Sequence, residues 1–298
     1  MRLFRSHRAT GVGVGLASVV LLVSGLVGPL TPTLGDSHPG PAPSASDYLA
    51  LGDSVTFGYR ESANLPTPDY SDASTFVGYP EDVAAGLGLN VANAACPGET
   101  STSLIEPNVL SNGCENSPGG GPGYRTLYPL HVSYSGTQLQ YALRFLRTHP
   151  HTELVSLMIG ANDGFLCEAT TADHCATELP AVLKQVSSNV ADILWSIRHL
   201  ARYHRQIVIV NYYSLDYSNP TDNAGSEALN QAVDSAAQPF DVRIADGFSA
   251  FQNAAVQSSG DTCNAGLLTQ LTTGGCGIHP SVAGQALLAL AVEKAIRS

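Results

Sequence analysis

The sequence predicts an α/β protein, in the form of a three-layer α/β/α sandwich with a parallel, flavodoxin-like sheet. Two patterns predict this fold. Short apolar runs that end at turn residues recur along the chain, and segments with apolar residues at helical spacing lie between them. Strands that alternate with helices are joined by crossovers, which make the sheet parallel and place helices on both of its faces.

Five apolar runs are the expected strands, and the second is the weakest of them. They cover residues 48–51, 89–95, 154–159, 207–210 and 242–245. Short runs bounded by glycine or polar residues are typical of buried strands. The carboxyl ends of such strands carry the functional sites of open α/β sheets, so the turns that follow them are where we expect chemistry.

Three long segments are expected to be helices, and a short helix is expected to begin near Ser54. The first long segment, 179–203, places apolar residues at helical spacing: Val182, Val186, Val190, Ile193, Ile197 and Leu200. The other two cover 226–237 and 281–296. The inner face of the last one is expected to carry Leu287, Leu290 and Ala291.

The 298-residue chain is expected to consist of three parts. Residues 1–30 place three arginines before a long uncharged run, the layout of an export signal, with an uncleaved membrane anchor as the alternative. Residues 31–46 form a proline-rich linker, and residues 47–298 form one folded domain. We therefore expect a secreted protein, with attachment to the cell envelope as the alternative.

Composition narrows the possible partners. An apolar content of 44% in a chain of this length supports a sizeable core and excludes disorder as the main state. The net charge of −11 argues against binding to nucleic acid, which requires a basic face. We expect a monomer that contacts membranes only through an uncleaved N-terminal segment or a lipid substrate.

Six cysteines in an exported chain indicate a disulfide framework. They fall into three neighbouring couples, which we expect to be the bonded pairs: Cys96 with Cys114, Cys167 with Cys175, and Cys263 with Cys276. A zinc site of Cys263, Cys276 and His279 is a less favoured alternative, because it lacks a convincing fourth ligand. No metal is expected.

Three positions that follow the expected strands could carry chemistry. Ser54 follows the first strand and could be a nucleophile, although Asp53 or Ser54 could equally just cap a helix. Asn162 could donate its amide to an oxyanion or form a turn, and Gly98 could offer its N–H group or be an ordinary turn glycine.

His279 is the histidine expected at the edge of the sheet, on a loop between a strand and the last helix. The others lie in the export signal, the linker, helix ends or loops: His7, His38, His131, His149, His151, His174, His199 and His204. Those in the folded domain are expected to be surface residues.

Together these pieces resemble the SGNH hydrolases, also called the GDSL esterase/lipase family. The matching residues are Ser54 in Gly-Asp-Ser-x-x-x-Gly, then Gly98, then Asn162 in Gly-x-Asn-Asp, and His279 in His-Pro-Ser. The resemblance implies that Ser54 is the nucleophile and His279 the base. It also implies an oxyanion hole made of the Ser54 and Gly98 N–H groups and the Asn162 amide, without any cofactor.

One departure concerns the partner of His279. Family members with a full triad carry Asp three residues before the histidine, where this chain has Cys276. The chain is similar to secreted actinobacterial members that use a Ser-His dyad, including their three disulfides. The resemblance therefore implies that a backbone carbonyl within 274–276 holds His279, with Asp261 and Asp246 as the acidic alternatives.

The expected function is that of a secreted serine esterase or lipase acting on carboxylic esters, with fatty-acid esters favoured. A carbohydrate deacetylase, or a non-catalytic surface protein that binds lipid or glycan, are the alternatives. The polar, Gly/Pro-rich stretches 62–79 and 111–136 are expected to line the substrate cleft. Nearby apolar residues could form an acyl site or belong to the core: Tyr59, Phe76, Tyr79, Phe165 and Leu166.

Overall fold

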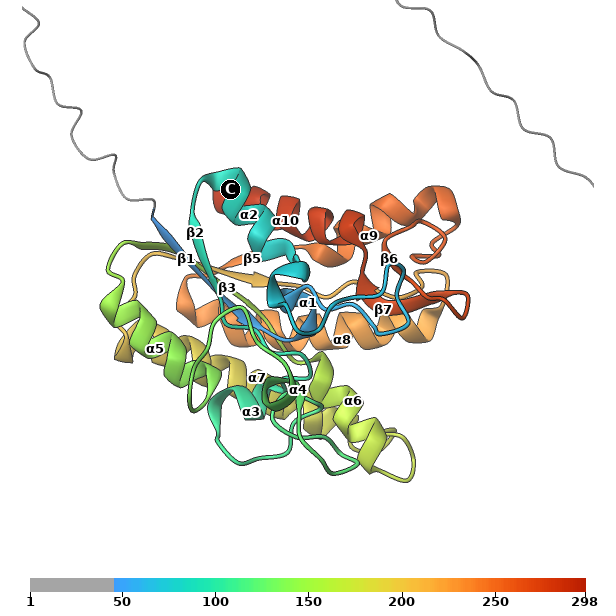
Figure 1. Cartoon of the computed structure of the whole chain (residues 1–298), viewed down its shortest axis with the longest axis horizontal. Coiled ribbons are helices and arrows are strands. Elements are labelled where there is room, and N and C mark those ends of the chain that lie inside the picture. The colour runs from blue at the N-terminus through green and yellow to red at the C-terminus, as the bar shows by residue number, and fades with distance from the viewer. Residues whose placement is uncertain (1–45) are drawn as a thin grey trace, which may run out of the picture. The chain divides into compact units, whose positions relative to one another are not determined.

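A computed structural model describes residues 46–298, and they contain a five-stranded parallel sheet (Figure 1). The predicted export signal and nearly all of the predicted linker lie outside the described residues. The strands are β1 (Asp47–Gly52), β2 (Asn90–Asn93), β3 (Thr152–Met158), β4 (Gln206–Val210) and β5 (Arg243–Ala245). Their spatial order, β2-β1-β3-β4-β5, is that of a flavodoxin-like sheet, which confirms the predicted fold class.

Helices cover both faces of this sheet, and the alternation of side chains along each strand supplies a core to each face. On one face Leu49, Leu51 and Val155 pack against helices α3 (Ser101–Ile105), α5 (Gln138–Thr148), α7 (Leu179–Trp195) and α8 (Pro220–Ala237). On the other face Tyr48, Ala50 and Val208 pack against α2 (Tyr79–Leu87), α9 (Gly247–Ala255) and α10 (Val282–Arg297). The two helical layers are seen above and below the sheet in Figure 1.

The long helices differ from their predicted bounds in three ways. The helix predicted over 179–203 is α7, which ends at Trp195. The chain continues from there in a π-helical turn, Ser196–Leu200. α8 starts earlier than predicted, because Asn219 caps it and Pro220 takes the first helical position. In α10 the predicted inner residue Leu290 is 60% exposed, and Leu288 and Val292 face the core instead.

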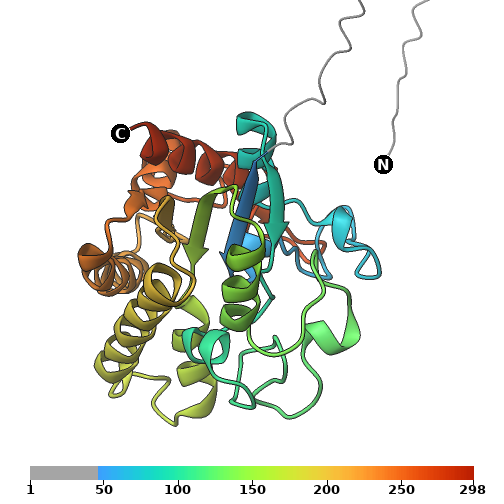
Figure 2. The same ribbon diagram turned by 90° about the vertical axis from the view of Figure 1, so that its left-hand side faces the viewer.

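Several elements were not predicted. The most important is an antiparallel hairpin of β6 (Leu268–Gln270) and β7 (Cys276–Pro280), so His279 lies on a strand and not on a loop. The short helix expected near Ser54 is α1 (Ser54–Phe57). The short helices that were not predicted are α4 (Tyr124–Leu127), α6 (Ala161–Thr170), and the 3-10 turns Ala73–Thr75, Gln238–Phe240 and Val256–Ser258. The loop before α2 and the segment around α4 project on the same side of the sheet (Figure 2).

The cysteines pair as expected. The disulfides are Cys96–Cys114, Cys167–Cys175 and Cys263–Cys276. The last pair uses both cysteines of the alternative zinc site, so that alternative is wrong.

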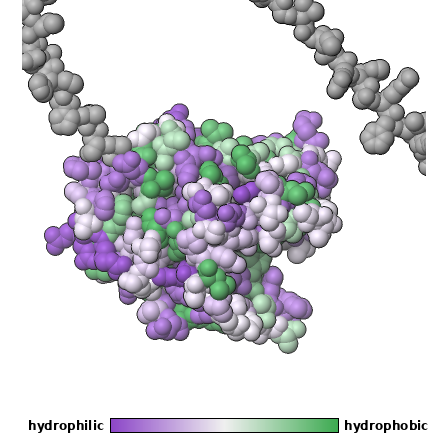
Figure 3. Space-filling model, viewed as in Figure 1, coloured by the Kyte–Doolittle hydropathy of each residue, from purple (hydrophilic) through white to green (hydrophobic). Residues whose placement is uncertain are grey.

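The surface in Figure 3 carries small apolar patches scattered among polar side chains. Within residues 46–298 no helix combines the length and the hydropathy that a membrane span needs.

Candidate active site

The turn after β1 presents Ser54 at the carboxyl edge of the sheet. Gly52 ends the strand with φ of +150°, and a Cβ atom there would lie 2.4 Å from the carbonyl oxygen of Met158. Asp53 then caps α1 by accepting a hydrogen bond from the Val55 N–H at 2.9 Å. Ser54 is therefore the first helical residue, and the capping interpretation holds for Asp53 and not for Ser54.

His279 reaches Ser54 from β7. Its Nε2 atom lies 2.9 Å from the Ser54 Oγ atom. The imidazole is only 8% exposed, and the Tyr59 ring packs edge-on against it with 4.9 Å between ring centroids. The hairpin thus delivers a nearly buried imidazole to the serine hydroxyl.

Glu61 occupies the other side of the imidazole. Its Oε1 atom lies 2.7 Å from His279 Nδ1 and accepts the Ile278 N–H at 2.9 Å, while its Oε2 atom accepts the Thr269 hydroxyl at 2.6 Å. Burial raises the pKa of Glu61, but the hydrogen bond and the charge interaction with His279, together with the Thr269 hydroxyl, outweigh it and lower the pKa to about 2. Glu61 is therefore an ionised partner for His279.

This contact corrects the expected orientation of His279 by a backbone carbonyl within 274–276. The acidic alternatives are also wrong, because Asp261 accepts from the Asn264 backbone and side chain, and Asp246 caps α9. Gly277 explains why a carboxylate fits here. A Cβ atom at Gly277 would lie 2.1 Å from Glu61 Oε1, so the missing side chain makes room for the acid.

Gly98 and Asn162 line the same cavity as Ser54 and His279. Gly98 has φ of +82°, and its carbonyl accepts the Asn112 N–H at 2.9 Å. The Asn162 side chain is held at both ends: its Oδ1 accepts from Asn112 Nδ2 at 2.8 Å, and its Nδ2 donates to Asp53 Oδ2 at 3.3 Å. Asn162 Nδ2 carries a second hydrogen beyond the one given to Asp53, and the residue lines the cavity.

Two aspartates, Asp53 and Asp163, connect segments around the site through hydrogen bonds. Asp53 also accepts the Tyr212 hydroxyl at 2.5 Å, and burial raises the pKa of Asp53 to about 6 despite that bond. Asp163 accepts from the backbone N–H of Ser101 at 2.8 Å and from its hydroxyl at 2.6 Å, and burial raises its pKa to about 6. Asp163 thereby connects the start of α6 to the start of α3.

The cavity in front of Ser54 has a volume of about 940 Å³. Away from the serine, aliphatic and aromatic side chains from α6, α7, α8 and the loop after β4 line it: Phe165, Leu179, Val182, Leu183, Leu215 and Leu229. Tyr59 and Tyr124 also line it. A cavity of this size, mostly apolar with a few convergent polar groups, has the features of a ligand site.

The apolar residues expected near the site divide into two groups. Tyr59 and Phe165 line the cavity, whereas Phe76 and Tyr79 are fully buried in the core and Leu166 does not line the cavity. Of the loops expected to line the cleft, 111–136 contributes through Asn112, Gly113 and Tyr124, whereas no residue of 62–79 lines the cavity.

The histidines expected on the surface follow that expectation with one exception. His131 is half buried, and its Nε2 atom lies 3.0 Å from the Phe57 carbonyl oxygen.

Within residues 46–298 one group of potential metal ligands lies close together, made of Cys96, Glu99 and Cys114. The two cysteines are joined in a disulfide and offer no thiolate. This cluster is therefore not a metal site.

The arrangement has the chemistry of an activated serine. The Ser54 hydroxyl is hydrogen-bonded to one nitrogen of the His279 imidazole, and the Glu61 carboxylate is hydrogen-bonded to the other. In such an arrangement the hydroxyl can lose its proton to the imidazole while its oxygen attacks a carbonyl carbon. Sequence reasoning missed Glu61 because it lies seven positions after Ser54 in an irregular loop and not next to His279. The signal that could have pointed to another acid was Gly277, a glycine two positions before His279 in the same strand, β7.

Comparisons with known proteins identify the family of the chain and show similar folds. The sequence model of the GDSL-like Lipase/Acylhydrolase family matches residues 50–287. Among solved structures, phospholipase A1 from Streptomyces albidoflavus NA297 is similar, with 18% identity and a TM-score of 0.54 over 85% of this chain and 100% of that one. Acetylxylan esterase Axe2 from Geobacillus stearothermophilus gives 18% identity and 0.51 over 84% and 94%. No curated protein matches the sequence.

Proposed function

Because the chain belongs to the GDSL-like lipase/acylhydrolase family, we propose that it is a secreted serine esterase that hydrolyses fatty-acid esters. Members of that family are carboxylic ester hydrolases, and this chain is one of them. The observation that carries the proposal is the position of His279. Its two ring nitrogens lie 2.9 Å from the Ser54 hydroxyl and 2.7 Å from the Glu61 carboxylate.

The reaction starts with proton transfer from Ser54 Oγ to His279 Nε2 as Ser54 attacks the ester carbonyl carbon. Glu61 keeps the proton of the imidazole on Nδ1 and stabilises the imidazolium that forms. His279 then protonates the leaving alcohol, which leaves an acyl group on Ser54. A water molecule that gives its proton to His279 attacks this acyl-enzyme, and His279 returns that proton to Ser54 Oγ as the bond to the acyl group breaks and the acid is released.

The negative charge that develops on the carbonyl oxygen is stabilised by three groups. They are the backbone N–H groups of Ser54 and Gly98 and the side-chain amide of Asn162. Their common position on the cavity wall supports this assignment. The hydrogen bonds of Asn162 to Asn112 and Asp53 support it as well, because they hold the amide before substrate arrives.

The cavity favours a long acyl group. Its volume of about 940 Å³ lies near the upper end of the range for drug-sized ligands, whereas an acetyl group would leave nearly all of it empty. The aliphatic side chains of α7 and α8 supply an apolar wall for a hydrocarbon chain. Apolar burial of about 0.8 kcal/mol per CH₂ group then favours longer chains.

A carbohydrate deacetylase is the second candidate. The similarity to an acetylxylan esterase concerns the fold, which is compatible with both substrate classes. Polar side chains on the rim of the cavity, Glu168 and Asp222, are the feature that would suit a sugar. The non-catalytic alternative is not favoured, since a binding protein has no need of a serine, a histidine and a carboxylate in this chain of contacts.

Export is part of the proposal. The basic and then apolar pattern of residues 1–30 and the three disulfides of the folded domain support it. We also propose that the protein works as a monomer and does not bind nucleic acid.

The test is the turnover of p-nitrophenyl esters of graded acyl length by the disulfide-bonded protein and by Ser54→Ala. Turnover that rises from acetyl to medium-length acyl groups and is abolished by Ser54→Ala supports the fatty-acid esterase. Activity restricted to acetyl esters would favour the deacetylase. A folded protein that hydrolyses none of the esters would refute the proposal.

A further inference from the structure

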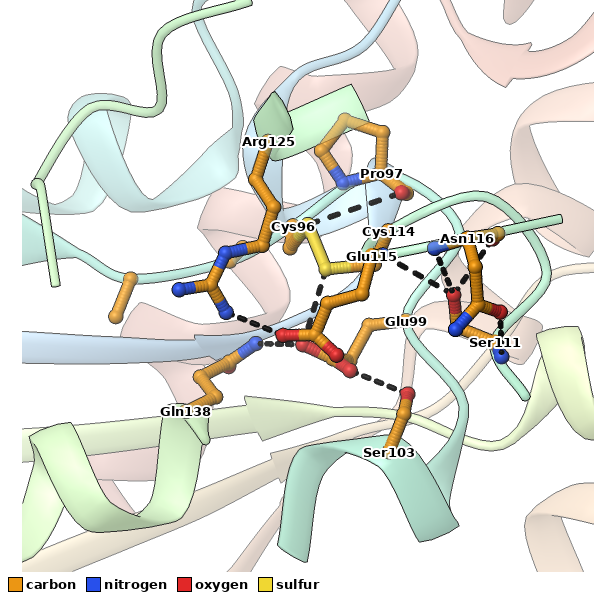
Figure 4. The surroundings of a disulfide bond; sticks show 12 residues. Cys96, Pro97, Glu99, Ser103, Ser111, Cys114, Glu115, Asn116, Arg125 and Gln138 are labelled. Carbon is orange, nitrogen blue, oxygen red and sulfur yellow. Dashed lines mark hydrogen bonds and ion pairs between the residues drawn. A yellow bond between two sulfur atoms is a disulfide. The ribbon is translucent and has the colours of Figure 1, made fainter. Parts of the chain in front are cut away.

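A buried carboxyl group lies directly behind the proposed oxyanion hole. Glu99 follows Gly98 in the chain and is only 1% exposed. Figure 4 shows Gln138, Ser103 and the Cys96–Cys114 disulfide converging on it. Gln138 Nε2 donates to its Oε2 atom, its Oε1 atom is hydrogen-bonded to the Ser103 Oγ atom, which can accept a proton from a neutral acid, and Cys114 Sγ lies 3.6 Å from Oε2.

Gln138 connects this carboxyl group to the turn that carries Ser54. Its amide donates to the Gly52 carbonyl at 3.0 Å and to Glu99 Oε2 at 3.0 Å, and its Oε1 atom accepts the Gly52 N–H at 2.6 Å. Glu99 itself donates its backbone N–H to the Cys96 carbonyl at 3.1 Å. The Gly52 turn and the Gly98 turn are therefore held together through one pair of side chains.

The charged groups that face Glu99 offer it no direct ion pair. Within the described residues they are Glu115 and Arg125, and the neutral phenol of Tyr134 is the other titratable group that faces Glu99. The Arg125 guanidinium donates to Glu115 and to the backbone carbonyls of Gly136 and Tyr134. Tyr134 donates to the Ala94 carbonyl. An ionised Glu99 would thus be a buried charge without a bonded cation, which is costly.

We propose that Glu99 is a positioning residue that works as a neutral carboxylic acid, holding Gly98 and, through Gln138, the Ser54 turn in the geometry that binds the oxyanion. Burial raises the pKa of Glu99 to about 8, in agreement with a neutral acid at neutral pH. Ionisation places a charge between the two turns, which must shift or admit water to solvate it. This inference rests on the proposed esterase activity.

The inference predicts an alkaline limb in the pH profile of kcat. Activity of the wild-type protein should fall as pH rises through about 8, with KM changed less than kcat. Glu99→Gln cannot ionise, so it should keep near wild-type kcat at neutral pH and lose the alkaline limb. Glu99→Leu removes both hydrogen-bonding oxygens and should lower kcat by about 10–100-fold at every pH, less than the roughly 10²–10³-fold lost when an oxyanion donor is removed, because the donors are only displaced.

Asp234→Asn is the matched control. Asp234 is another partly buried carboxyl group whose pKa is raised by burial, but it lies on α8 and accepts from Asn211. Its variant should keep the wild-type pH profile. An alkaline limb that persists unchanged in Glu99→Gln, or a folded Glu99→Leu with wild-type kcat, would overturn the inference.

A measurement without turnover separates this inference from the proposed function. Infrared spectra in D₂O near neutral pH should contain the carbonyl stretch of a neutral carboxylic acid that is absent from Glu99→Gln and present in Asp234→Asn. The band should disappear as the pH rises through about 8. Its absence from the wild type would refute the neutral acid even if the protein is an active esterase, and failure to hydrolyse any ester would refute the proposed function while leaving the band in place.

Discussion

His279 has a hydrogen-bond partner at each ring nitrogen, and the partner at Nδ1 comes from an unexpected part of the chain. Glu61 and His279 are 218 residues apart in the sequence, yet Glu61 also accepts the backbone N–H of Ile278. The carboxylate therefore binds the strand as well as the ring. Its role combines orientation of the imidazole with stabilisation of its charge.

Replacement of Glu61 by Gln tests this role. We expect kcat to fall by about 10²–10⁴-fold, because an amide can hold the wrong tautomer of His279 and cannot stabilise the imidazolium. Asp261→Asn is the control and should be nearly silent, since Asp261 binds Asn264. Steady-state kinetics of both variants test this prediction. A Glu61→Gln protein with full kcat would show that Ser54 and His279 act as a dyad without Glu61.

The same variant should change the pH dependence of stability. The pKa of Glu61 is lowered from 4.5 to about 2 on folding, so its stabilising contribution is present above pH 4.5 and is lost as the pH falls toward 2. The melting temperature of the wild type should therefore fall more steeply on acidification than that of Glu61→Gln. Thermal unfolding at several pH values measures the difference.

Replacement of Asn162 tests the proposed oxyanion hole. Asn162→Ala should lower kcat by about 10²–10³-fold, because it removes one preorganised donor to the oxyanion. KM should change little, since the bond forms mainly in the transition state. Asn253→Ala, at an exposed position of α9, serves as the control, and equal kcat in both variants would contradict the assignment.

At the scale of elements, the β6–β7 hairpin determines the position of the histidine. The Cys263–Cys276 disulfide anchors its second strand, and the Tyr213 hydroxyl donates to the Ile278 carbonyl at 2.6 Å. The hairpin must also approach the Glu61 loop closely, which Gly277 permits. The hairpin and the loop after α1 therefore form the site together.

Gly277→Ala tests the close approach. The new Cβ atom would overlap Glu61 Oε1, so the carboxylate must leave His279 and kcat should fall nearly as far as in Glu61→Gln. Gly119→Ala introduces the same methyl group where no atom lies within 4 Å and should have wild-type kcat. Kinetics with circular dichroism separate loss of the contact from loss of the fold.

The elements also show what the sequence could predict. β1, β3 and β4 were predicted because they are buried on both faces, which gives continuous apolar runs. The hairpin was missed because β6 and β7 are short and polar and depend on a disulfide and on tertiary packing. Local sequence motifs identify four of the candidate site residues: Ser54, Gly98, Asn162 and His279. Glu61 could not be predicted in this way, because its role depends on a contact between distant segments.

At the scale of the whole molecule, the large cavity between the sheet edge and α6, α7 and α8 governs substrate choice. Leu183→Trp, on α7, fills part of this cavity. It should lower turnover of long-chain esters on the order of tenfold relative to acetyl esters, because it blocks the space for the chain. Leu290→Trp, on an exposed position of α10, should leave the ratio unchanged.

A chain-length profile of both variants with p-nitrophenyl esters measures that ratio. If Leu183→Trp lowered acetyl and long-chain turnover equally, the cavity would not be the acyl site.

The most direct test of the account is covalent labelling of the nucleophile. The intact protein is treated with a fluorophosphonate, and the adduct is located by mass spectrometry of its peptides. The account predicts a single adduct on Ser54, none on Ser54→Ala, and slower labelling of Glu61→Gln. Labelling of another serine in the wild type, or labelling of Glu61→Gln at the wild-type rate, would contradict a nucleophile activated by His279 and Glu61.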